Sequence, residues 1–145
     1  MKFRKARKKD VPEMFEILKI NSSEYPKKLA LQELNEMFSK SLLKPNYIVV
    51  EDKKEILGFG GFIPSWIDNM VFNIFWVNIN PKYKNQGIGS KLMNDLISRI
   101  KKIKNIKAKM ILISTKIPIF YKKFGFKIIT HKYDGDYVLM SLNLN

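Results

Sequence analysis

The strongest constraint on this chain is a strand-turn-helix pattern over residues 77–93. An apolar run at residues 70–79, rich in β-branched and aromatic side chains, predicts a buried strand. Apolar residues at helical spacing then predict a helix over residues 86–104. Gly87 and Gly89 lie between the two, where missing side chains give a ligand access to backbone N–H groups. Because those groups begin a helix and carry the positive end of its dipole, the turn predicts an anion site, most simply for phosphate.

Two common phosphate-binding motifs do not describe this turn. The P-loop pattern GxxxxGK followed by Ser or Thr is absent, and no third glycine completes GxGxxG after Gly87 and Gly89. The stretch instead resembles the acyl-CoA pyrophosphate loop of the GNAT superfamily of N-acyltransferases. In that family V-x-P and an aromatic residue precede the pattern Q/R-x-x-G-x-G/A and a helix with leucines.

The residues that carry this resemblance follow one another without a gap. Ile79-Asn80-Pro81 and then Tyr83 take the first places, and Lys84-Asn85-Gln86-Gly87-Ile88-Gly89 takes the loop. Lys84 stands where the family usually has Gln or Arg, and it keeps a hydrogen-bond donor and a positive charge. A glycine turn of this kind is also compatible with a purely structural role, so a second motif is needed.

The second motif is Phe120-Tyr121-Lys122-Lys123-Phe124-Gly125-Phe126, which matches the family's F-Y-x-K-x-G-F. It lies a little over thirty residues downstream of the first, where the family places it. In the family the tyrosine lies near the thioester sulfur and often serves as general acid, so the resemblance assigns that role to Tyr121. The two motifs, in this order and at this spacing, make the resemblance specific, and it extends over nearly the whole chain.

The resemblance implies the fold class α/β (α+β). It implies a GNAT fold with a mixed, mostly antiparallel seven-stranded sheet, helices on both faces and the element order βααβββαβαββ. The sequence patterns predict strands at residues 2–6, 46–51, 55–63, 70–79, 107–114, 126–132 and 137–144. They predict helices at residues 28–42, 86–104 and 117–124, after a first helix that begins at an Asp10 N-cap with Glu13 three residues on.

Length and composition predict one domain over residues 1–145, because a chain of 145 residues that is 46% hydrophobic can bury a core of its own. Gly58, Gly60 and Gly61 lie inside a strand pattern with no helix after them. They predict a β-bulge or a close backbone approach rather than a phosphate loop.

Several classes of site are excluded by composition. The chain has no cysteine, so we expect no disulfide, no cysteine nucleophile and no thiolate metal site. We expect no metal among the site residues. No signal segment and no run of 18 apolar residues is present, which predicts a cytoplasmic protein without a membrane partner. The net charge of +14 favours polyanionic ligands such as CoA, but dispersed lysines are typical of a solvated surface rather than of specific nucleic-acid recognition. We expect a monomer or a homodimer.

The resemblance further implies acetyl-CoA as cofactor and direct acyl transfer in a ternary complex. Family members splay their fourth and fifth strands, and the pantetheine arm pairs with fourth-strand backbone, here that of Val77, Asn78 and Ile79. The cofactor-binding residues implied in addition are Lys84, Asn85, Gln86, Gly87, Ile88, Gly89, Ser90, Ser114 and Tyr121. Ser114 stands where many members have Asn, and its hydroxyl can still bond to pantetheine amides.

The general base is where the family pattern fails. Members often carry Glu six residues before the Val of V-x-P, and that position is Asn73 in this chain. Asn73 cannot accept a proton at neutral pH, so it either orients a water or is a polar residue satisfied within the sheet. For the only histidine, His131, we expect a structural role.

Acidic and aromatic residues in two loops are the candidates for acceptor binding. Glu24 and Tyr25 follow the first predicted helix, and Asp134 and Asp136 lie in the last predicted hairpin. In the GNAT fold these loops border the acceptor groove, and carboxylates there suit a cationic amine.

We therefore expect an N-acetyltransferase whose acceptor is a small-molecule amine or a peptide or protein N-terminus. The alternatives are a catalytically silent acyl-CoA-binding or regulatory domain, suggested by Asn73, and a basic nucleic-acid-binding module.

Overall fold

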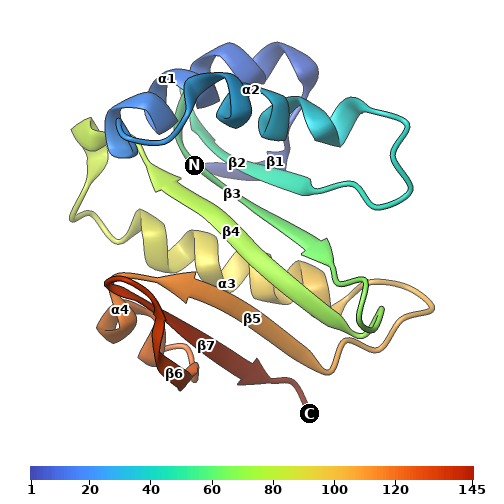
Figure 1. The fold of residues 1–145 in the computed structure, drawn as a ribbon. Helices are drawn as coiled ribbons and strands as arrows, with labels where there is room; N and C mark the ends of the chain where they lie inside the picture. Colours follow the sequence, from blue (N-terminus) through green and yellow to red (C-terminus); the bar gives the residue numbers. More distant parts are fainter.

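A seven-stranded sheet runs through the computed structural model, which describes all residues from Met1 to Asn145 (Figure 1). The strand order is β1-β2-β3-β4-β5-β7-β6, and every neighbouring pair is antiparallel except β4 and β5. This confirms the mixed, mostly antiparallel sheet. The strands are β1 (Lys2–Lys5), β2 (Asn46–Asp52), β3 (Glu55–Pro64), β4 (Val71–Ile79), β5 (Met110–Thr115), β6 (Lys127–Asp134) and β7 (Tyr137–Asn143).

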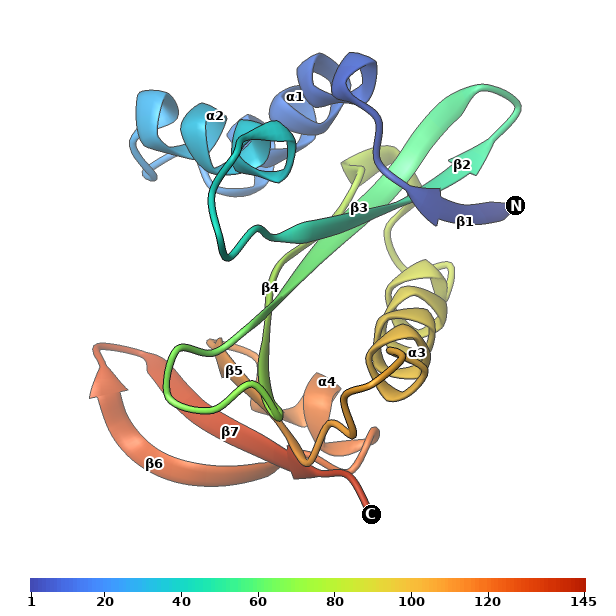
Figure 2. The ribbon, with the colours of Figure 1, turned by 90° about the vertical axis from the view of Figure 1, so that its right-hand side faces the viewer.

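Helices cover both faces of the sheet, as expected. Helices α1 (Val11–Asn21) and α2 (Lys27–Asn35) cover one face, and α3 (Ile88–Lys101) and α4 (Pro118–Lys122) cover the other (Figure 2). Each face has its own apolar core, the larger one beneath α3 and α4 and the smaller one beneath α1 and α2. The observed order of strands and α-helices is the predicted one. No helix is both long enough and apolar enough to cross a membrane.

The second helix ends earlier than its apolar pattern predicts. Helix α2 stops at Asn35, and a 3₁₀ turn, η2 (Glu36–Phe38), follows it. The hydroxyl of Ser39 donates 2.8 Å to the carbonyl oxygen of Glu36, which gives that carbonyl a partner outside a helix. The apolar periodicity therefore continues beyond the point where the backbone leaves the helix.

Asp10 holds the N-cap position of α1 as predicted, but its carboxylate does not cap the helix and makes other bonds. It accepts bonds of 2.8 and 3.0 Å from the guanidinium of Arg4 on β1 and of 2.6 Å from the backbone N–H of Arg7. The carboxylate of Glu13 accepts 2.8 Å from the N–H of Ile56 on β3. These acids attach α1 to the sheet instead of closing the first turn of the helix.

The glycines of β3 mark a bulge and close approaches, as predicted. The pairing of β3 with β4 shifts between Phe59 and Gly61. A Cβ on Gly61 would lie 2.8 Å from the ring of Tyr47, and one on Gly58 would lie 2.8 Å from the carbonyl oxygen of Asn78. Neighbouring side chains and backbone occupy the space that larger residues here would need.

Strands β4 and β5 separate after a short contact, and this confirms the expected splay. They pair from Val71 to Asn73 on β4 and from Met110 to Leu112 on β5. Beyond those residues β4 pairs only with β3, and β5 pairs only with β7. This leaves a gap in the sheet on the side of β4 that faces β5 (Figure 1).

We expect Asp10→Ala to lower the free energy of unfolding by about 2 kcal/mol at neutral pH, because Arg4 would keep only Glu51 as an acidic partner. Glu16→Ala is the matched control. Glu16 is an exposed α1 acid paired with Lys19, and its loss should cost less than about 0.5 kcal/mol. Urea denaturation of the two variants measures the difference, and equal losses would contradict the anchoring role.

The effect of Asp10 should also depend on pH. Burial opposes ionisation of this carboxyl, but the bonds from Arg4 and Arg7 hold its pKa below the ordinary 3.8. Its contribution is therefore complete above about pH 5 and is lost as the pH falls through the folded-state value. The stability difference between the wild type and Asp10→Ala should shrink below that pH.

Candidate functional site

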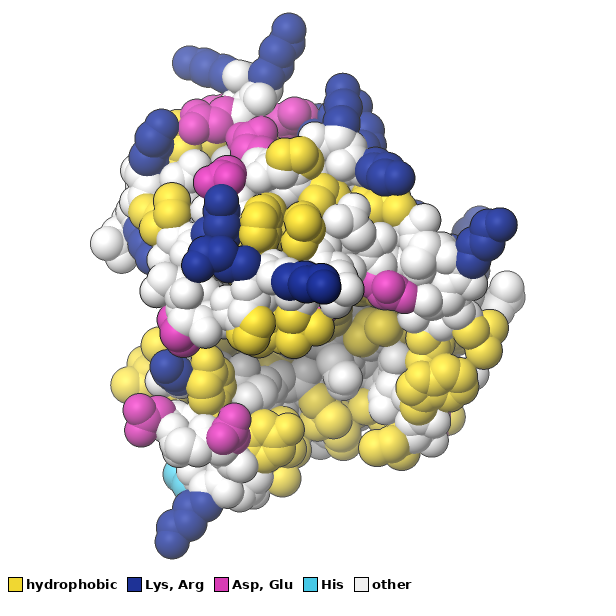
Figure 3. All heavy atoms as spheres, turned by 45° about the horizontal axis from the view of Figure 1, so that its top comes forward, with side chains coloured by type: hydrophobic (Ala, Val, Ile, Leu, Met, Phe, Trp, Pro, Cys, Tyr) yellow, Lys and Arg dark blue, Asp and Glu magenta, His cyan; other side chains and the backbone are white.

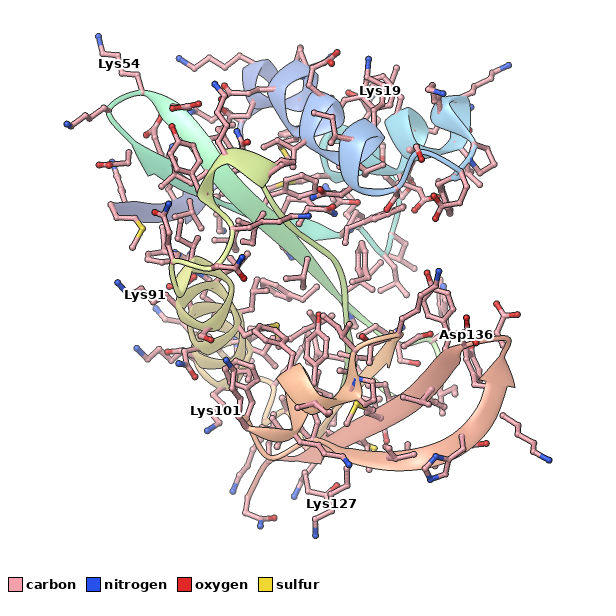
Figure 4. All side chains as sticks on the ribbon, turned by 90° about the vertical axis from the view of Figure 1, so that its left-hand side faces the viewer. Lys19, Lys54, Lys91, Lys101, Lys127 and Asp136 are labelled. Atoms are coloured by element: carbon pink, nitrogen blue, oxygen red, sulfur yellow. The ribbon has the colours of Figure 1, made fainter.

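A cavity of about 600 Å³ lies at the gap between β4 and β5. The end of α1, the end of β4, the turn before α3 with the first residues of α3, and α4 form its walls. Figure 4 looks at this side of the molecule, with α3 on the left and α1 and α2 at the upper right. The lining residues are Asn21, Ser22, Val77, Asn78, Ile79, Tyr83, Lys84, Asn85, Gly87, Ile88, Gly89, Ser90, Ile117, Phe120, Tyr121 and Lys123.

Backbone conformation at the turn presents the N-terminus of α3 to this cavity. Gly87 precedes the helix with φ +77°, and no side chain caps the helix there. Asn85 also has a positive φ of 64°. Since the first N–H groups of a helix have no partner within it, the turn offers donors for an anion at the positive end of the α3 dipole.

The charges around the cavity have one sign. Lys84 and Lys123 are among the lining residues, and no Asp or Glu is. The ammonium group of Lys123 donates 2.6 Å to the hydroxyl of Ser90 and lies 4.5 Å from the centre of the Phe120 ring. These two contacts hold one positive charge beside the start of α3.

The opposite wall joins α1 to the end of β4. The side-chain amide of Asn21 donates 3.1 Å to Asn78 Oδ1 and 2.9 Å to the carbonyl oxygen of Ile79. Asn21 Oδ1 is buried and has no hydrogen-bond partner in the protein. A buried acceptor without a partner is rare in folded proteins.

Strand β4 bulges where it meets the cavity. The register passes from Phe75 opposite Gly61 to Asn78 opposite Phe59, so Trp76 and Val77 face the single residue Gly60. A bulge leaves a residue out of the ladder, and its backbone groups become available to other partners.

Tyr121 lies at the apolar end of the cavity, on α4. Its side chain is 8% exposed and packs edge-on against the rings of Phe120 and Phe126. Burial raises the pKa of the Tyr121 hydroxyl to about 12, so the group is protonated at neutral pH. Within the protein this hydroxyl has no hydrogen-bond partner, and it is free to donate to a ligand.

The structure brings most of the predicted cofactor residues together, with two exceptions. Gln86 lies in a neighbouring cavity of about 430 Å³, together with Lys91. Ser114 is exposed on β5, beyond the segment that pairs with β4. Asn73 is half-buried within the sheet, between Ile63 and Leu112, and does not line the cavity.

The predicted acceptor residues lie on one side of the sheet. Glu24 and Tyr25 occupy the α1–α2 connection, whereas Asp134 ends β6 and Asp136 lies in the turn to β7, and the gap separates the two pairs (Figure 1). Figure 3 shows a groove between these two layers, with hydrophobic side chains along it and acidic side chains near one end. Glu24, Asp134 and Asp136 are exposed, whereas Tyr25 is half-buried and donates its hydroxyl to Glu33.

Sequence reasoning missed several lining residues. Phe120 and Lys123 belong to the second motif, and their spacing on either side of Tyr121 could have indicated them. Asn21 and Ser22 carry no such signal, because only the packing of α1 against β4 brings them to the cavity.

Comparison with protein families gives one match. The model of the acetyltransferase (GNAT) domain matches residues 44–128, more than half of the chain. The matched segment contains the turn before α3 and Tyr121, but not the acceptor candidates of the α1–α2 connection and the β6–β7 turn. No sequence among curated proteins matches the chain.

Solved structures share the fold over nearly its full length at low sequence identity. An aminoglycoside 6'-N-acetyltransferase complexed with coenzyme A has a TM-score of 0.80 and 15% identity, covering 99% of this chain and 97% of its own. A GNAT-family acetyltransferase from Staphylococcus aureus Mu50 has a TM-score of 0.77 and 21% identity, covering 99% of each chain. The ribosomal-protein-S18-alanine N-acetyltransferase from Escherichia coli has a TM-score of 0.76 and 14% identity, covering 99% and 94%.

Proposed function

Because the chain belongs to the GNAT family of acetyltransferases, we propose that residues 1–145 form one domain that transfers an acetyl group from acetyl-CoA to an amine. The observation that carries this proposal is the acid-free cavity at the gap between β4 and β5, which ends at the uncapped start of α3. An anionic nucleotide ligand fits its charge, and an elongated acyl carrier fits its position along β4.

The residues of the cavity suit two parts of acetyl-CoA, its pyrophosphate and its pantetheine arm. The N–H groups at residues 87–90 and the charges of Lys84 and Lys123 would hold the pyrophosphate. Farther in, the Asn21 amide, which bonds to Asn78 and to the carbonyl oxygen of Ile79, would fix the β4 wall along which the pantetheine arm lies. The coenzyme A bound to a similarly folded aminoglycoside 6'-N-acetyltransferase supports this choice of ligand.

Acetyl-CoA supplies a thioester, and the protein's part is to orient it and to stabilise the charges that develop. A neutral amine attacks the carbonyl carbon, and a backbone N–H at the β4 bulge donates to the carbonyl oxygen as it gains negative charge. The C–S bond then breaks, the thiolate leaves and the extra proton of the new amide passes to solvent.

For Tyr121, the pKa limits what its hydroxyl can do. A thiol has a pKa of about 8.5, so full proton transfer from a tyrosine of pKa about 12 to the thiolate would be unfavourable. The role that we propose is therefore a hydrogen bond to the departing sulfur, which is strongest as the charge develops.

The acceptor is the part of the reaction that Asn73 constrains. Without a carboxylate at this position, the enzyme has no base there to neutralise an ammonium ion. Amines that are already partly neutral should therefore react best, which favours α-amino groups and low-pKa small amines. Acetyltransferases of this fold that are named for aminoglycosides and for the alanine of ribosomal protein S18 show that the fold accommodates both kinds of acceptor.

We expect Gly89→Glu to abolish acetyl-CoA binding in a folded protein. A Cβ on Gly89 would be in ordinary contact with Phe120, at 3.4 Å, so the fold should tolerate it, whereas the carboxylate would repel the pyrophosphate. Asn94→Glu, which adds the same charge at an exposed α3 position, is the matched control. Calorimetry that finds near-wild-type affinity for Gly89→Glu would rule out the turn as the pyrophosphate site.

Tyr121→Phe should lower kcat by about 100-fold, because a donor that acts only as the sulfur leaves contributes to the transition state and not to binding. The dissociation constant of acetyl-CoA should change little. Thiol release follows the reaction cleanly, since the protein has no cysteine. Tyr133→Phe removes an exposed hydroxyl and serves as control. A change in kcat below about threefold would mean that Tyr121 only packs.

Competition between two peptides tests the acceptor class. At pH 7.4 an α-amino group of pKa about 7.8 is roughly 30% neutral, and a lysine ε-amino group of pKa about 10.4 is about 0.1% neutral. We therefore expect a peptide with a free N-terminus to be acetylated faster, by up to about 300-fold, than an N-terminally blocked peptide with an internal lysine. Faster reaction of the blocked peptide would show that a base at another position operates.

The same assays separate the enzyme from a silent binding domain. A silent domain would be stabilised by acetyl-CoA but would release no thiol with any amine of a broad panel. The observation that favours this second function is that residue 73 is an asparagine and not a carboxylate.

A further inference from the structure

Trp76 has an unusual backbone conformation for a residue inside a strand. Five residues other than glycine have a positive φ, and Trp76, at φ 49°, is the only one of them that lies in a strand. A bulky side chain in this region is strained by an amount on the order of 1–3 kcal/mol, and such strain persists only where neighbouring contacts impose it. The contacts of Trp76 therefore show what the bulge depends on.

Two residues from the α1–α2 layer hold the Trp76 side chain. The indole N–H donates 2.7 Å to Glu33 Oε1, and the ring lies edge-on to Tyr25 with centroids 4.8 Å apart. The hydroxyl of Tyr25 donates 2.5 Å to the other oxygen, Glu33 Oε2. Both oxygens of one carboxylate are thus used to fix a tryptophan and its stacking partner.

Glu33 is itself fixed by its position on the fold. It lies on α2, and its backbone carbonyl accepts 3.0 Å from the hydroxyl of Tyr47 on β2. Burial, together with the bond to Glu33, raises the pKa of Tyr25 to about 12, so Tyr25 remains a donor at every pH at which the protein would work.

The restrained residue adjoins the proposed acetyl-CoA site. Val77, Asn78 and Ile79 line the cavity, and Trp76 precedes them directly. A shift in the φ of Trp76 would change the direction of the next peptide group, whose N–H belongs to Val77 in the bulge and could donate to the thioester oxygen.

We infer that Glu33 is a positioning residue for acyl transfer, because its carboxylate, through Trp76 and Tyr25, holds the β4 bulge in the shape that the thioester site requires. The inference rests on the proposed function for its catalytic consequence. It also gives Tyr25 a role in supporting the bulge rather than in direct contact with the acceptor.

The first test compares carboxylate and amide at residue 33. Glu33→Ala removes both acceptors and should lower kcat by about tenfold or more, since a displacement of about 1 Å can cost up to about 100-fold. Acetyl-CoA affinity should change by less than about threefold, because the pyrophosphate contacts at α3 are separate. Glu33→Gln keeps an oxygen for the indole N–H and should recover most of kcat.

The matched control is Glu36→Ala. Glu36 lies one turn along the same segment, and its carboxylate accepts bonds from the hydroxyls of Ser39 and Ser41 instead of from Trp76. Its removal deletes the same charge from the same region and should leave kcat within about twofold, because a screened charge away from the reacting atoms has little effect.

A double-mutant cycle tests whether Glu33 acts through Trp76. Trp76→Phe removes the indole N–H, so adding Glu33→Ala to it should lower kcat much less than Glu33→Ala does in the wild type. Additive losses, or wild-type kcat in Glu33→Ala, would overturn the inference. If Glu33→Ala does not fold, the comparison is made with Glu33→Gln and Trp76→Phe, and then a wild-type kcat in Trp76→Phe would overturn it.

Fluorescence provides a readout that does not need turnover. The chain has two tryptophans, and Trp66 is 77% exposed, so Trp66→Phe leaves Trp76 as the only emitter. In that background Glu33→Ala should shift the emission wavelength of Trp76 and increase its quenching by acrylamide. Glu36→Ala should change neither quantity. Unchanged emission in Glu33→Ala would overturn the inference, whereas failure of the wild type to bind or turn over acetyl-CoA would overturn only the proposed function.

Discussion

Strand β4 pairs with β5 only from Val71 to Asn73 and then leaves it, and the rest of the site depends on this divergence. In a continuous sheet the backbone groups after Asn73 would bond to a neighbouring strand, but here that edge borders a cavity of about 600 Å³. An open edge inside a protein has to be closed by other elements. Helix α1 closes it from one face through Asn21, and the start of α3 closes it from the other together with α4.

Basic and acidic side chains lie in different parts of this region. Lys84 and Lys123 line the cavity and no acid does, although the protein carries 13 acidic residues. Asp134 and Asp136 lie instead at the β6–β7 turn, across the gap from the α1–α2 connection. The basic residues of the cavity and the acidic residues of this turn therefore lie in separate parts of the protein.

The bulge connects these two regions. Gly60 accommodates it from β3, since a Cβ there would lie 2.9 Å from Leu96 Cδ1 on α3 and 3.4 Å from Val77 Cγ2. Glu33 restrains it from α2 through the indole of Trp76. The α1–α2 layer thus does more than cover a sheet face, because it bonds to the strand that forms the wall of the cavity.

The sequence alone determined the order of the elements, the glycine turn before α3 and the motif around Tyr121, because periodicity, glycine and local spacing are properties of neighbouring residues. It placed Asp10 correctly before α1 but not its carboxylate, which bonds to the guanidinium of Arg4 on β1 instead of capping the helix, and it gave no sign of Asn21 or Glu33. Asn21 and Glu33 act through partners on β4 that are far away in the chain. Only the packing of α1 and α2 on the sheet decides which groups meet, since burial makes each polar atom take the partner that tertiary structure supplies.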